Sequence, residues 1–227
     1  HSRTGLVMDP YFSASKIHWL LTHVPDVIQA HNQGRLCLGT IDSWLIFKLT
    51  KGQSHVTDVS NASRTLLMNI HTGDWDPELC ALFGVPLESL PEILGNTSHF
   101  GISQIAPLKG VPITGVAGDQ QASLFGHRAF LKGDMKNTYG TGCFLLKNIG
   151  YQSSGLGGER APQGVLETIA WKLKDRMTYA WEGSVMNGGS AVQFLRDNLG
   201  IIKNAKETEA LALSLDSNEG VYFVPAF

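Results

Sequence analysis

The chain has 227 residues, a formal net charge of −2, 43% hydrophobic residues and 17% charged residues. This composition is typical of a globular protein with a sizeable core. The even charge balance, without a cluster of Lys or Arg, excludes the basic surface of a nucleic-acid-binding protein. No apolar run approaches the ~20 residues of a membrane-spanning helix, and the first residues lack the layout of a signal peptide.

The three cysteines, Cys37, Cys80 and Cys143, are odd in number and far apart. None belongs to a Cys-x-x-Cys pair and the histidines are scattered, so we expect neither a disulfide framework nor a metal site. Free thiols persist in reducing compartments, which favours a cytoplasmic protein. Asn61 and Asn96 match the Asn-x-Ser acceptor pattern for glycosylation, and in such a protein we interpret both matches as chance.

The first predicted element is a helix that follows Tyr11 and Phe12. Ser13 is a good N-cap, and Pro25 marks the end of the helix. If Ser13 caps the helix, Phe12 and Ile17 form a hydrophobic staple. Tyr11 then has no part in the staple, and its surroundings in the sequence indicate only a surface aromatic. The apolar residues at helical spacing are Ile17, Leu20, Leu21 and Val24.

A second helix is predicted over residues 36–50, started by Thr40 or Asp42 and ended by Gly52. Its inward-facing side chains would be those of Leu45, Ile46 and Leu49. Residues 56–67 are polar and mixed, which predicts a loop that leads into a strand at about residues 65–70.

Clear start and stop signals follow residue 75. Asp76 before Pro77 predicts an N-capped helix with proline at its first position, and Gly84 marks its end. Residues 90–95 predict another short helical turn. Residues 96–110 predict a loop with a short strand.

Residues 111–126 combine a strand, a turn and a helix. The β-branched residues Val111, Ile113 and Val116 predict a buried strand over residues 111–116, and a helix follows. Asp119 stands at the junction, outside the carboxyl end of the strand, where open α/β sheets bind ligands. Asp119 is therefore either the N-cap of the helix or a residue with a chemical role.

Glycine-rich turns mark the second half of the chain. A hairpin is predicted from strands over residues 136–139 and 143–147, joined by Gly140, Thr141 and Gly142. A surface loop over residues 150–164 and paired strands over residues 165–170 and 178–180 follow. The remaining predicted elements are a bend at 183–190 that opens a helix, a helix from a capping box of Asn204 and Glu207 to about residue 215, and a strand at 221–227.

Two of these turns have the residue types of a nucleotide site. Gly140 and Gly142 let backbone N–H groups converge beside the Thr141 hydroxyl, which suits phosphate oxygens, although glycine hairpin turns are common for other reasons. The Asn-Gly-Gly-Ser opening at residues 187–190 could let a nucleotide lie against bare backbone, or its glycines could only permit close packing.

Six blocks, taken together and in order, resemble the FGGY family of carbohydrate kinases. They are YFSASKIHWL at residues 11–20, GTIDSWL at 39–45, VTDVSNASRT at 56–65, GDQQA at 118–122, KNTYGTGCF at 136–144 and EGSV at 182–185. Chance would not set six such blocks in family order, and the resemblance covers essentially the whole chain.

The resemblance implies the fold and the site residues. The fold would be α/β and part of a two-lobed actin-like (ribonuclease H-like) ATPase, with two lobes flanking a cleft. Residues 1–128 would belong to the N-terminal lobe and residues 129–227 to the C-terminal lobe. By the same resemblance, Asp119 would be the catalytic base, and the substrate would contact Tyr11, Asp119, Gln120 and Phe144. The nucleotide would contact Gly140, Thr141, Gly142, Gly189 and Gln193.

Within the family, the blocks favour the members that phosphorylate glycerol with ATP and Mg²⁺ to give sn-glycerol 3-phosphate. The alternatives are a kinase of another polyol or sugar in the same family, and a non-catalytic nucleotide-binding remnant of the fold. The resemblance also implies a homo-oligomer, either a dimer or a tetramer, with no nucleic acid or membrane as a partner.

The chain departs from the family pattern at both ends. It lacks the opening phosphate loop, the early Arg-Glu pair of the glycerol pocket and the late adenine segment, so we interpret it as an interior fragment that is inactive alone. Family members inhibited by fructose 1,6-bisphosphate carry a Gly-rich loop with an arginine before the strand that leads to the base. Residues 107–111 contain no arginine, and Lys109 matches a phosphate less well, so we expect no such inhibition.

Overall fold

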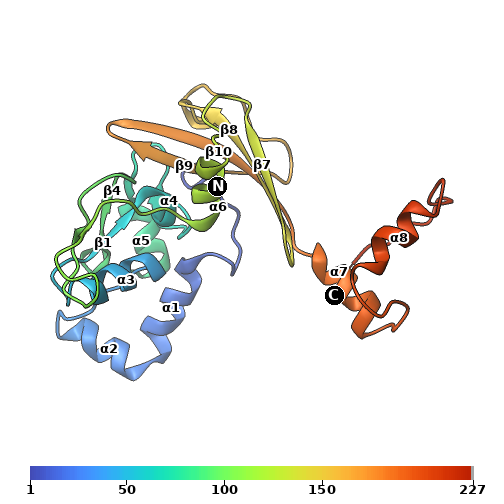
Figure 1. Ribbon diagram of the computed structural model, residues 1–227. Helices are drawn as coiled ribbons and strands as arrows, with labels where there is room; N and C mark the ends of the chain where they lie inside the picture. The colour runs from blue at the N-terminus through green and yellow to red at the C-terminus, as the bar shows by residue number, and fades with distance from the viewer. Residues whose placement is uncertain (226–227) are drawn as a thin grey trace. The chain divides into compact units, whose positions relative to one another are not determined.

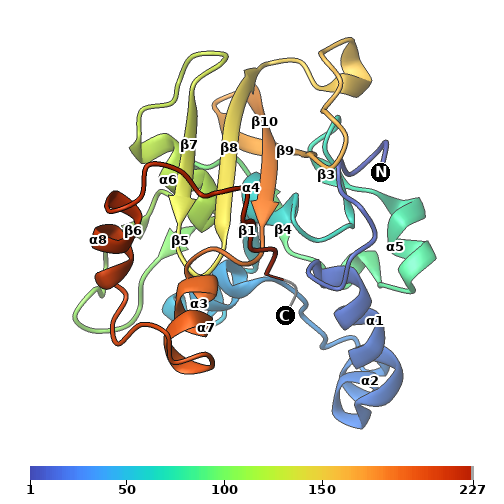
Figure 2. The same ribbon diagram turned by 90° about the vertical axis from the view of Figure 1, so that its right-hand side faces the viewer.

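The largest sheet in the computed structural model, which describes residues 1–225, has four strands in the order β7-β8-β10-β9. They are β7 (Met135–Tyr139), β8 (Cys143–Gly150), β9 (Leu166–Leu173) and β10 (Arg176–Val185), seen side by side in Figure 2. The hairpin predicted around Gly140 and the paired strands predicted from residue 165 are confirmed. Strand β9 pairs antiparallel with β10 beyond the predicted ends, because the tight turn at Lys174, with φ of 53°, lets the ladder continue to Leu173.

The described chain separates into two compact units. The first consists of His1–Lys136 and Leu146–Glu182, and the second of Asn137–Leu145 and the residues from Gly183 onward. The lobe boundary that we expect near residue 128 concerns the whole two-lobed protein and stays a prediction. No helix in the part of the chain that the structure describes is long and apolar enough to cross a lipid bilayer.

Helices α1 (Ser13–His23) and α2 (Pro25–Asn32) follow the first loop (Figure 1). The prediction that Ser13 is the N-cap was wrong. The cap position falls on Phe12, and no side chain caps α1. Phe12 is only 2% exposed and packs with Ile17 in the core of the first unit. Burial of the Phe12 ring therefore sets the start of α1. Pro25 ends α1 by starting α2 at its first position.

Helix α3 (Ile41–Leu49) is shorter than the predicted helix over residues 36–50. The residues before it form no helix, and Leu38 N donates a hydrogen bond to Ser89 O (2.8 Å). The predicted inward face was also wrong at Leu45, which is 53% exposed. Polar Asp42 is buried instead, because its carboxylate accepts a hydrogen bond of 2.6 Å from Thr57 Oγ1.

A short parallel pair of strands replaces two predicted irregular segments. Strand β1 (Val56–Asp58) pairs with β4 (Glu92–Leu94), and helix α4 (Val59–Ala62) follows β1 directly. The predicted loop over residues 56–67 and the predicted helical turn at 90–95 were therefore wrong. The polar residues of β1 are fully buried, which requires partners that the local sequence does not reveal. The strand predicted at 65–70 is present only as β2 (Met68–Asn69), paired with β3 (Asp74–Trp75).

The start and end predicted for the helix after residue 75 are confirmed in α5 (Pro77–Phe83). A short 3₁₀ helix, Leu87–Ser89, follows it. Asp76 caps α5 by accepting hydrogen bonds from the amides of Glu78 and Leu79, and Gly84 ends it with φ of 63°. A left-handed residue at this position is favourable for glycine, which has no Cβ.

The short strand predicted within residues 96–110 is confirmed as β5 (Gly101–Ile102), paired antiparallel with β6 (Pro112–Ile113). The buried strand predicted over residues 111–116 was wrong in extent and burial, since β6 has two residues and Val111 is 49% exposed. Within the described chain, β6 pairs only with β5, so it belongs to a two-stranded sheet and not to the interior of a larger one. The helix predicted after it is α6 (Asp119–Gly126).

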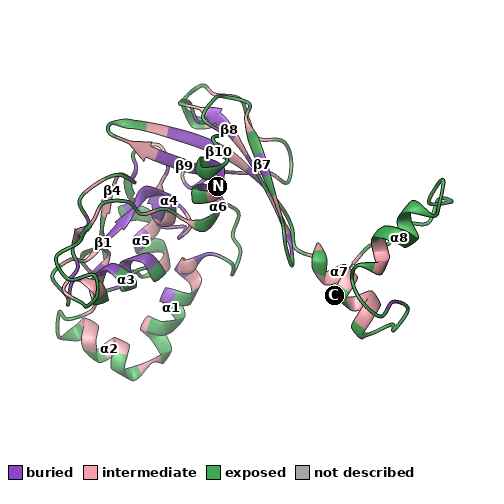
Figure 3. Cartoon of the chain, viewed as in Figure 1, coloured by how far each residue is buried: buried purple, intermediate pink, exposed green. Residues whose placement is uncertain are grey.

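The second unit contains helices α7 (Gly189–Asp197) and α8 (Glu207–Leu213), as predicted. In the first unit, the loop between β8 and β9 contains a 3₁₀ turn, Ser154–Leu156. The residues of α7 and α8 are exposed or intermediate in Figure 3. Asn204 N donates to Glu207 Oε1 (3.2 Å), although α8 begins only at Glu207. The strand predicted at residues 221–227 was wrong over 221–225, and residues 226–227 lie outside the described chain.

Candidate active site

Asp119 is the first residue of helix α6, and its side chain is exposed. The N-cap position belongs to Gly118, so Asp119 is not the cap of this helix. Among the residues that the structure describes, the one hydrogen bond to its carboxylate comes from Gln120 Nε2 (3.2 Å). An exposed carboxylate with few partners can accept a proton from a bound hydroxyl, and this role stays a prediction.

A buried lysine lies next to this carboxylate. Lys136 of β7 is only 4% exposed, and its Nζ donates a hydrogen bond to Gln120 Oε1. The Gln120 amide is thus held at both ends, by Lys136 and by Asp119. Burial lowers the pKa of Lys136, while the carboxylates of Asp119 and Glu182 act to raise it. Lys136 opens the block at residues 136–144, but nothing in its local sequence indicates that it is buried beside Gln120.

A series of side-chain contacts runs from Tyr11 through Phe12 and Arg64 to Glu182. The Tyr11 ring is 58% exposed and meets the Phe12 ring edge-on, with centroids 5.4 Å apart. The Arg64 guanidinium lies 5.2 Å from the centroid of the Phe12 ring and forms a 2.7 Å ion pair with Glu182. Arg64 and Glu182 stand in two of the six sequence blocks, but nothing in their local sequence indicated that they pair.

In the second unit, the turn at Gly140 packs against the start of helix α7. Gly140 N donates to Gly142 O (2.9 Å), which closes the turn. The turn carbonyls then accept hydrogen bonds from the other segment: Gly188 N donates to Thr141 O and Gly189 N to Gly140 O, both at 2.7 Å. Thr141 itself is exposed, so its hydroxyl is accessible to a ligand.

The glycines of these two segments are required for their packing. A Cβ on Gly142 would lie 2.8 Å from Val185 O, one on Gly188 2.7 Å from Cys143 Sγ, and one on Gly189 2.8 Å from Gly140 O. These distances are shorter than any ordinary contact of a Cβ. Close packing, one of the two interpretations of residues 187–190, is therefore sufficient to explain Gly188 and Gly189, and nucleotide binding there stays a prediction.

Gln193 lines an open hollow of about 410 Å³ on the second unit. Its other lining residues are Ser190, Phe194, Asp197 and Asn198. Phe194 also stacks on Phe223, with ring centroids 6.1 Å apart. Phe144 belongs to the second unit as well and is half-buried, so its predicted contact with the substrate stays a prediction.

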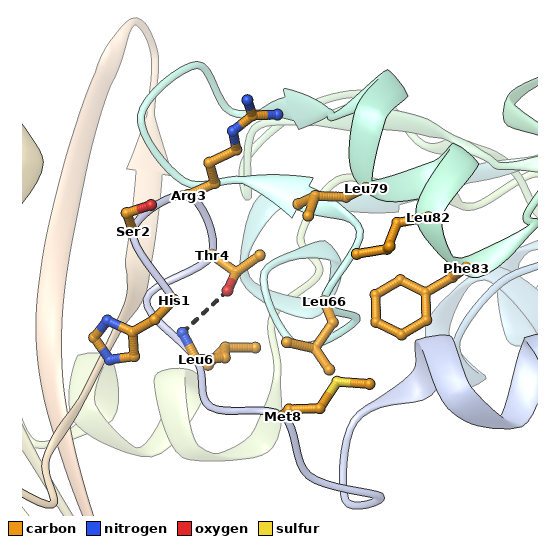
Figure 4. A pocket seen from close by; sticks show the side chains of 10 residues that line it. All are labelled: His1, Ser2, Arg3, Thr4, Leu6, Met8, Leu66, Leu79, Leu82 and Phe83. Carbon is orange, nitrogen blue, oxygen red and sulfur yellow. Dashed lines mark hydrogen bonds between the residues drawn. The ribbon is translucent and has the colours of Figure 1, made fainter.

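A different hollow, of about 290 Å³, lies at the start of the chain (Figure 4). Figure 4 shows Leu66, Leu79, Leu82 and Phe83 on one side of it, with the segment from His1 to Met8 opposite. None of the predicted site residues lines it. Within the described residues, no group of three or more His, Cys, Asp or Glu side chains could hold a metal ion.

Comparison with known proteins identifies the family. Residues 1–126 match the model of the N-terminal domain of the FGGY family of carbohydrate kinases. A glycerol kinase of Bdellovibrio bacteriovorus is 53% identical over 99% of this chain, which covers 45% of that protein. The crystal structure of Plasmodium falciparum glycerol kinase with ADP superposes with a TM-score of 0.89 at 40% identity, over 100% of this chain and 44% of that one.

A xylulose kinase from Lactobacillus acidophilus shares the fold alone, with a TM-score of 0.76 at 21% identity, over 93% of this chain and 41% of that one. These similarities confirm the predicted fold class, which is part of an actin-like (ribonuclease H-like) ATPase fold. The chain spans less than half the length of the relatives that it matches. Since the family model covers residues 1–126 of 227, the chain belongs to the FGGY family of carbohydrate kinases.

Proposed function

We propose that the full-length protein containing this chain is an ATP-dependent glycerol kinase that produces sn-glycerol 3-phosphate. The observation that carries the proposal is the exposed Asp119 carboxylate at the start of α6, bound to Gln120 beside the buried Lys136. The 53% identity with a protein named glycerol kinase supports glycerol as the substrate.

In the proposed reaction, a glycerol hydroxyl oxygen attacks the γ-phosphorus of ATP. The new O–P bond forms as the bond from the γ-phosphorus to the bridging oxygen of ADP breaks, and Asp119 takes the hydroxyl proton. Tyr11 and Gln120 hold the other hydroxyls of glycerol, and Phe144 lines its apolar side. Phosphoryl transfer of this kind needs mainly positioning, a proton acceptor and charge stabilisation.

The nucleotide would be held by the second unit. Gly140, Thr141 and Gly142 would contact its phosphates, and the exposed Thr141 hydroxyl is suited to a phosphate oxygen. Gly189 and Gln193 would contact the nucleoside, a role for which the hollow beside Gln193 offers room. We propose that ATP is used together with Mg²⁺, and we propose no ligand for this ion among the described residues.

A substrate panel on the full-length protein tests the proposal. The purified protein is given ATP with glycerol, erythritol, xylulose or gluconate, and ADP release is followed for each. We expect the largest kcat/KM with glycerol. A larger value for another acceptor would assign the protein to a sibling kinase, and no turnover with any acceptor would favour a non-catalytic remnant.

We further propose, from family resemblance, a homo-oligomer, either a dimer or a tetramer, and, from cysteine usage, a cytoplasmic location. The mass of the full-length protein by light scattering tests the first point. A monomer at micromolar concentration would contradict it.

A further inference from the structure

The loop that carries Asp119 is held by its backbone. Between β6 and α6, Val116 N donates to Asn96 O (3.1 Å), and Asn96 Nδ2 donates back to Val116 O (2.9 Å). Gly118 N donates to Ser60 Oγ (2.9 Å). Three hydrogen bonds thus hold residues 116 and 118, directly before Asp119. Two of the three come from side chains that are distant in the sequence.

The same two side chains converge on one buried carboxylate. Asp58 is 0% exposed, and its Oδ2 accepts hydrogen bonds from Asn96 Nδ2 and from Ser60 N, both at 2.7 Å, and one from Ser60 Oγ. Its Oδ1 accepts a further one from Asn61 Nδ2 (2.6 Å). Asp58 therefore fixes the Ser60 hydroxyl so that its oxygen lone pair faces Gly118 N.

Asn96 also ties the loop to the main sheet. Lys172 N of strand β9 donates to Asn96 Oδ1 (2.7 Å), and Asn96 N donates to Lys172 O (3.0 Å). The Asn96 side chain is 7% exposed, and its oxygen and both amide hydrogens have partners: Lys172 N, Asp58 Oδ2 and Val116 O. An asparagine used so fully has one possible orientation, and it transmits the position of β9 to Val116.

Gly118, the last residue of the loop, packs closely against the buried side chain of Gln121. A Cβ at this position would lie 2.6 Å from Gln121 Oε1, and Gln121 Nε2 donates to Ile169 O of β9 (3.3 Å). The Asp119 side chain, by contrast, is exposed and bound only by Gln120 among the described residues. The backbone before Asp119 therefore sets where its side chain leaves the main chain, while Gln120 contacts the carboxylate itself.

We propose that Asp58, Ser60 and Asn96 form a clasp that positions Asp119, by holding Val116 O and Gly118 N at the entrance of helix α6. The clasp rests on the proposed function, because it serves the base of that reaction. These are positioning residues, since none of them touches the reacting atoms. The clasp assigns a role to Asp58 and Ser60 of the block at residues 56–65, which the proposed reaction does not use. A displacement of about 1 Å at a catalytic group can lower a rate by ~10²-fold, so a rigid support of the loop matters.

A pair of serine variants in the full-length protein tests the clasp. Ser60→Ala removes the acceptor of Gly118 N. Ser63→Ala is its matched control. Ser63 is also buried, at 1% exposed, and its hydroxyl forms hydrogen bonds with Ser60 O (2.7 Å) and Thr168 Oγ1 (3.2 Å), and among the described residues with none of residues 116–118. We expect Ser60→Ala to lower kcat by about tenfold or more while KM for ATP stays within about twofold. Ser63→Ala should keep kcat within about twofold of the parent.

Amide hydrogen exchange provides a second readout that does not depend on the substrate. In Ser60→Ala, peptides covering residues 114–122 should exchange at least about tenfold faster than in Ser63→Ala, since an unbound loop amide opens more often. If Ser60→Ala does not fold, Ser60→Cys replaces it. A thiol is bulkier than a hydroxyl but can still donate to Asp58, and it accepts only weakly from Gly118 N, so an intermediate effect is expected.

The outcomes separate the clasp from the proposed function. Equal kcat for the two serine variants, or equal exchange of residues 114–122, overturns the clasp even if the parent phosphorylates glycerol. A parent that phosphorylates no acceptor in the panel overturns the proposed function, and the exchange measurement then decides whether the clasp holds the loop.

Discussion

Lys136, buried in strand β7, donates a hydrogen bond from Nζ to the side-chain oxygen of Gln120, the residue that follows Asp119. This bond forces the Gln120 amide to present its NH₂ group, and not its oxygen, to the Asp119 carboxylate. Without the lysine, the amide could turn over and place oxygen against oxygen. Lys136 therefore keeps the proposed base and its neighbour in a compatible arrangement.

Lys136→Met in the full-length protein should lower kcat/KM for glycerol by about tenfold or more, because Gln120 loses its fixed orientation. The control is Lys147→Met, since Lys147 is a half-buried lysine whose Nζ lies 5.4 Å from the centroid of the Trp181 ring. That variant should keep kcat/KM within about twofold. Steady-state kinetics with varied glycerol measures both, and equal losses in the two variants would remove Lys136 from the site.

Lys136→Met should lower activity without lowering the stability of the folded protein. Burial lowers the pKa of Lys136 by more than the carboxylates of Asp119 and Glu182 raise it. Between this lowered value and the usual lysine value of about 10.4, the unfolded chain binds more protons, so the parent gains stability as pH rises. Lys136→Met should therefore melt at or above the parent at pH 7, and the difference should shrink toward pH 10. A variant that melts well below the parent at pH 7 would show that the ammonium is needed for folding.

Asp76→Ala should destabilise the first unit by about 1 kcal/mol, because helix α5 loses its N-cap. Burial raises the pKa of the Asp76 carboxyl. Hydrogen bonds from Leu79 N and Asn69 and the charge of Arg3 together lower this pKa by more than burial raises it, so the net pKa is lowered. The stabilisation is therefore present above the unfolded value of about 3.9 and is lost as pH falls through the folded value.

Melting curves of the full-length protein at pH 7 and near pH 3 measure this effect. The control is Glu78→Ala, which removes only the exposed ion pair with Arg3 and should change the melting temperature little. An Asp76→Ala difference that is as large near pH 3 as at pH 7 would show that the charged cap is not its source.

Fructose 1,6-bisphosphate should not inhibit the full-length protein. Residues 107–111 offer one exposed lysine, Lys109, and no arginine to bind a phosphate through two parallel hydrogen bonds. Initial rates at saturating glycerol, titrated with the bisphosphate into the millimolar range, give the result. Strong inhibition would mean that other residues form an effector site.

Parts of the fold could be predicted because their signals are local. Asp76, Pro77 and Gly84 specify helix α5 by cap, first position and left-handed end, and the structure has all three features. Strand β1 could not be predicted in this way. Its residue Thr57 is polar yet buried, because it is satisfied by Asp42, and its partner strand β4 lies more than 30 residues further along the chain.

The site shows the same division. Asp119 and Gln120 could be proposed from a recognisable block at the junction of a strand and a helix. Lys136 and the clasp residues Ser60 and Asn96 could not, because their importance comes from tertiary contacts with segments distant in the sequence. From the sequence alone, a lysine in a strand is expected to face solvent, and the Asn-x-Ser triplet at Asn96 is interpreted as a chance match to a glycosylation pattern.

The most direct test of the proposed function is kcat and melting temperature of Asp119→Asn, measured on one preparation of the full-length protein. The amide is nearly isosteric but cannot take the proton of the glycerol hydroxyl, so kcat should fall by about 10²–10⁴-fold or more while ATP binding stays nearly unchanged. The melting temperature should also stay close to that of the parent, because Gly118, not Asp119, occupies the cap position. A kcat within about threefold of the parent would contradict the assignment of Asp119 as the base.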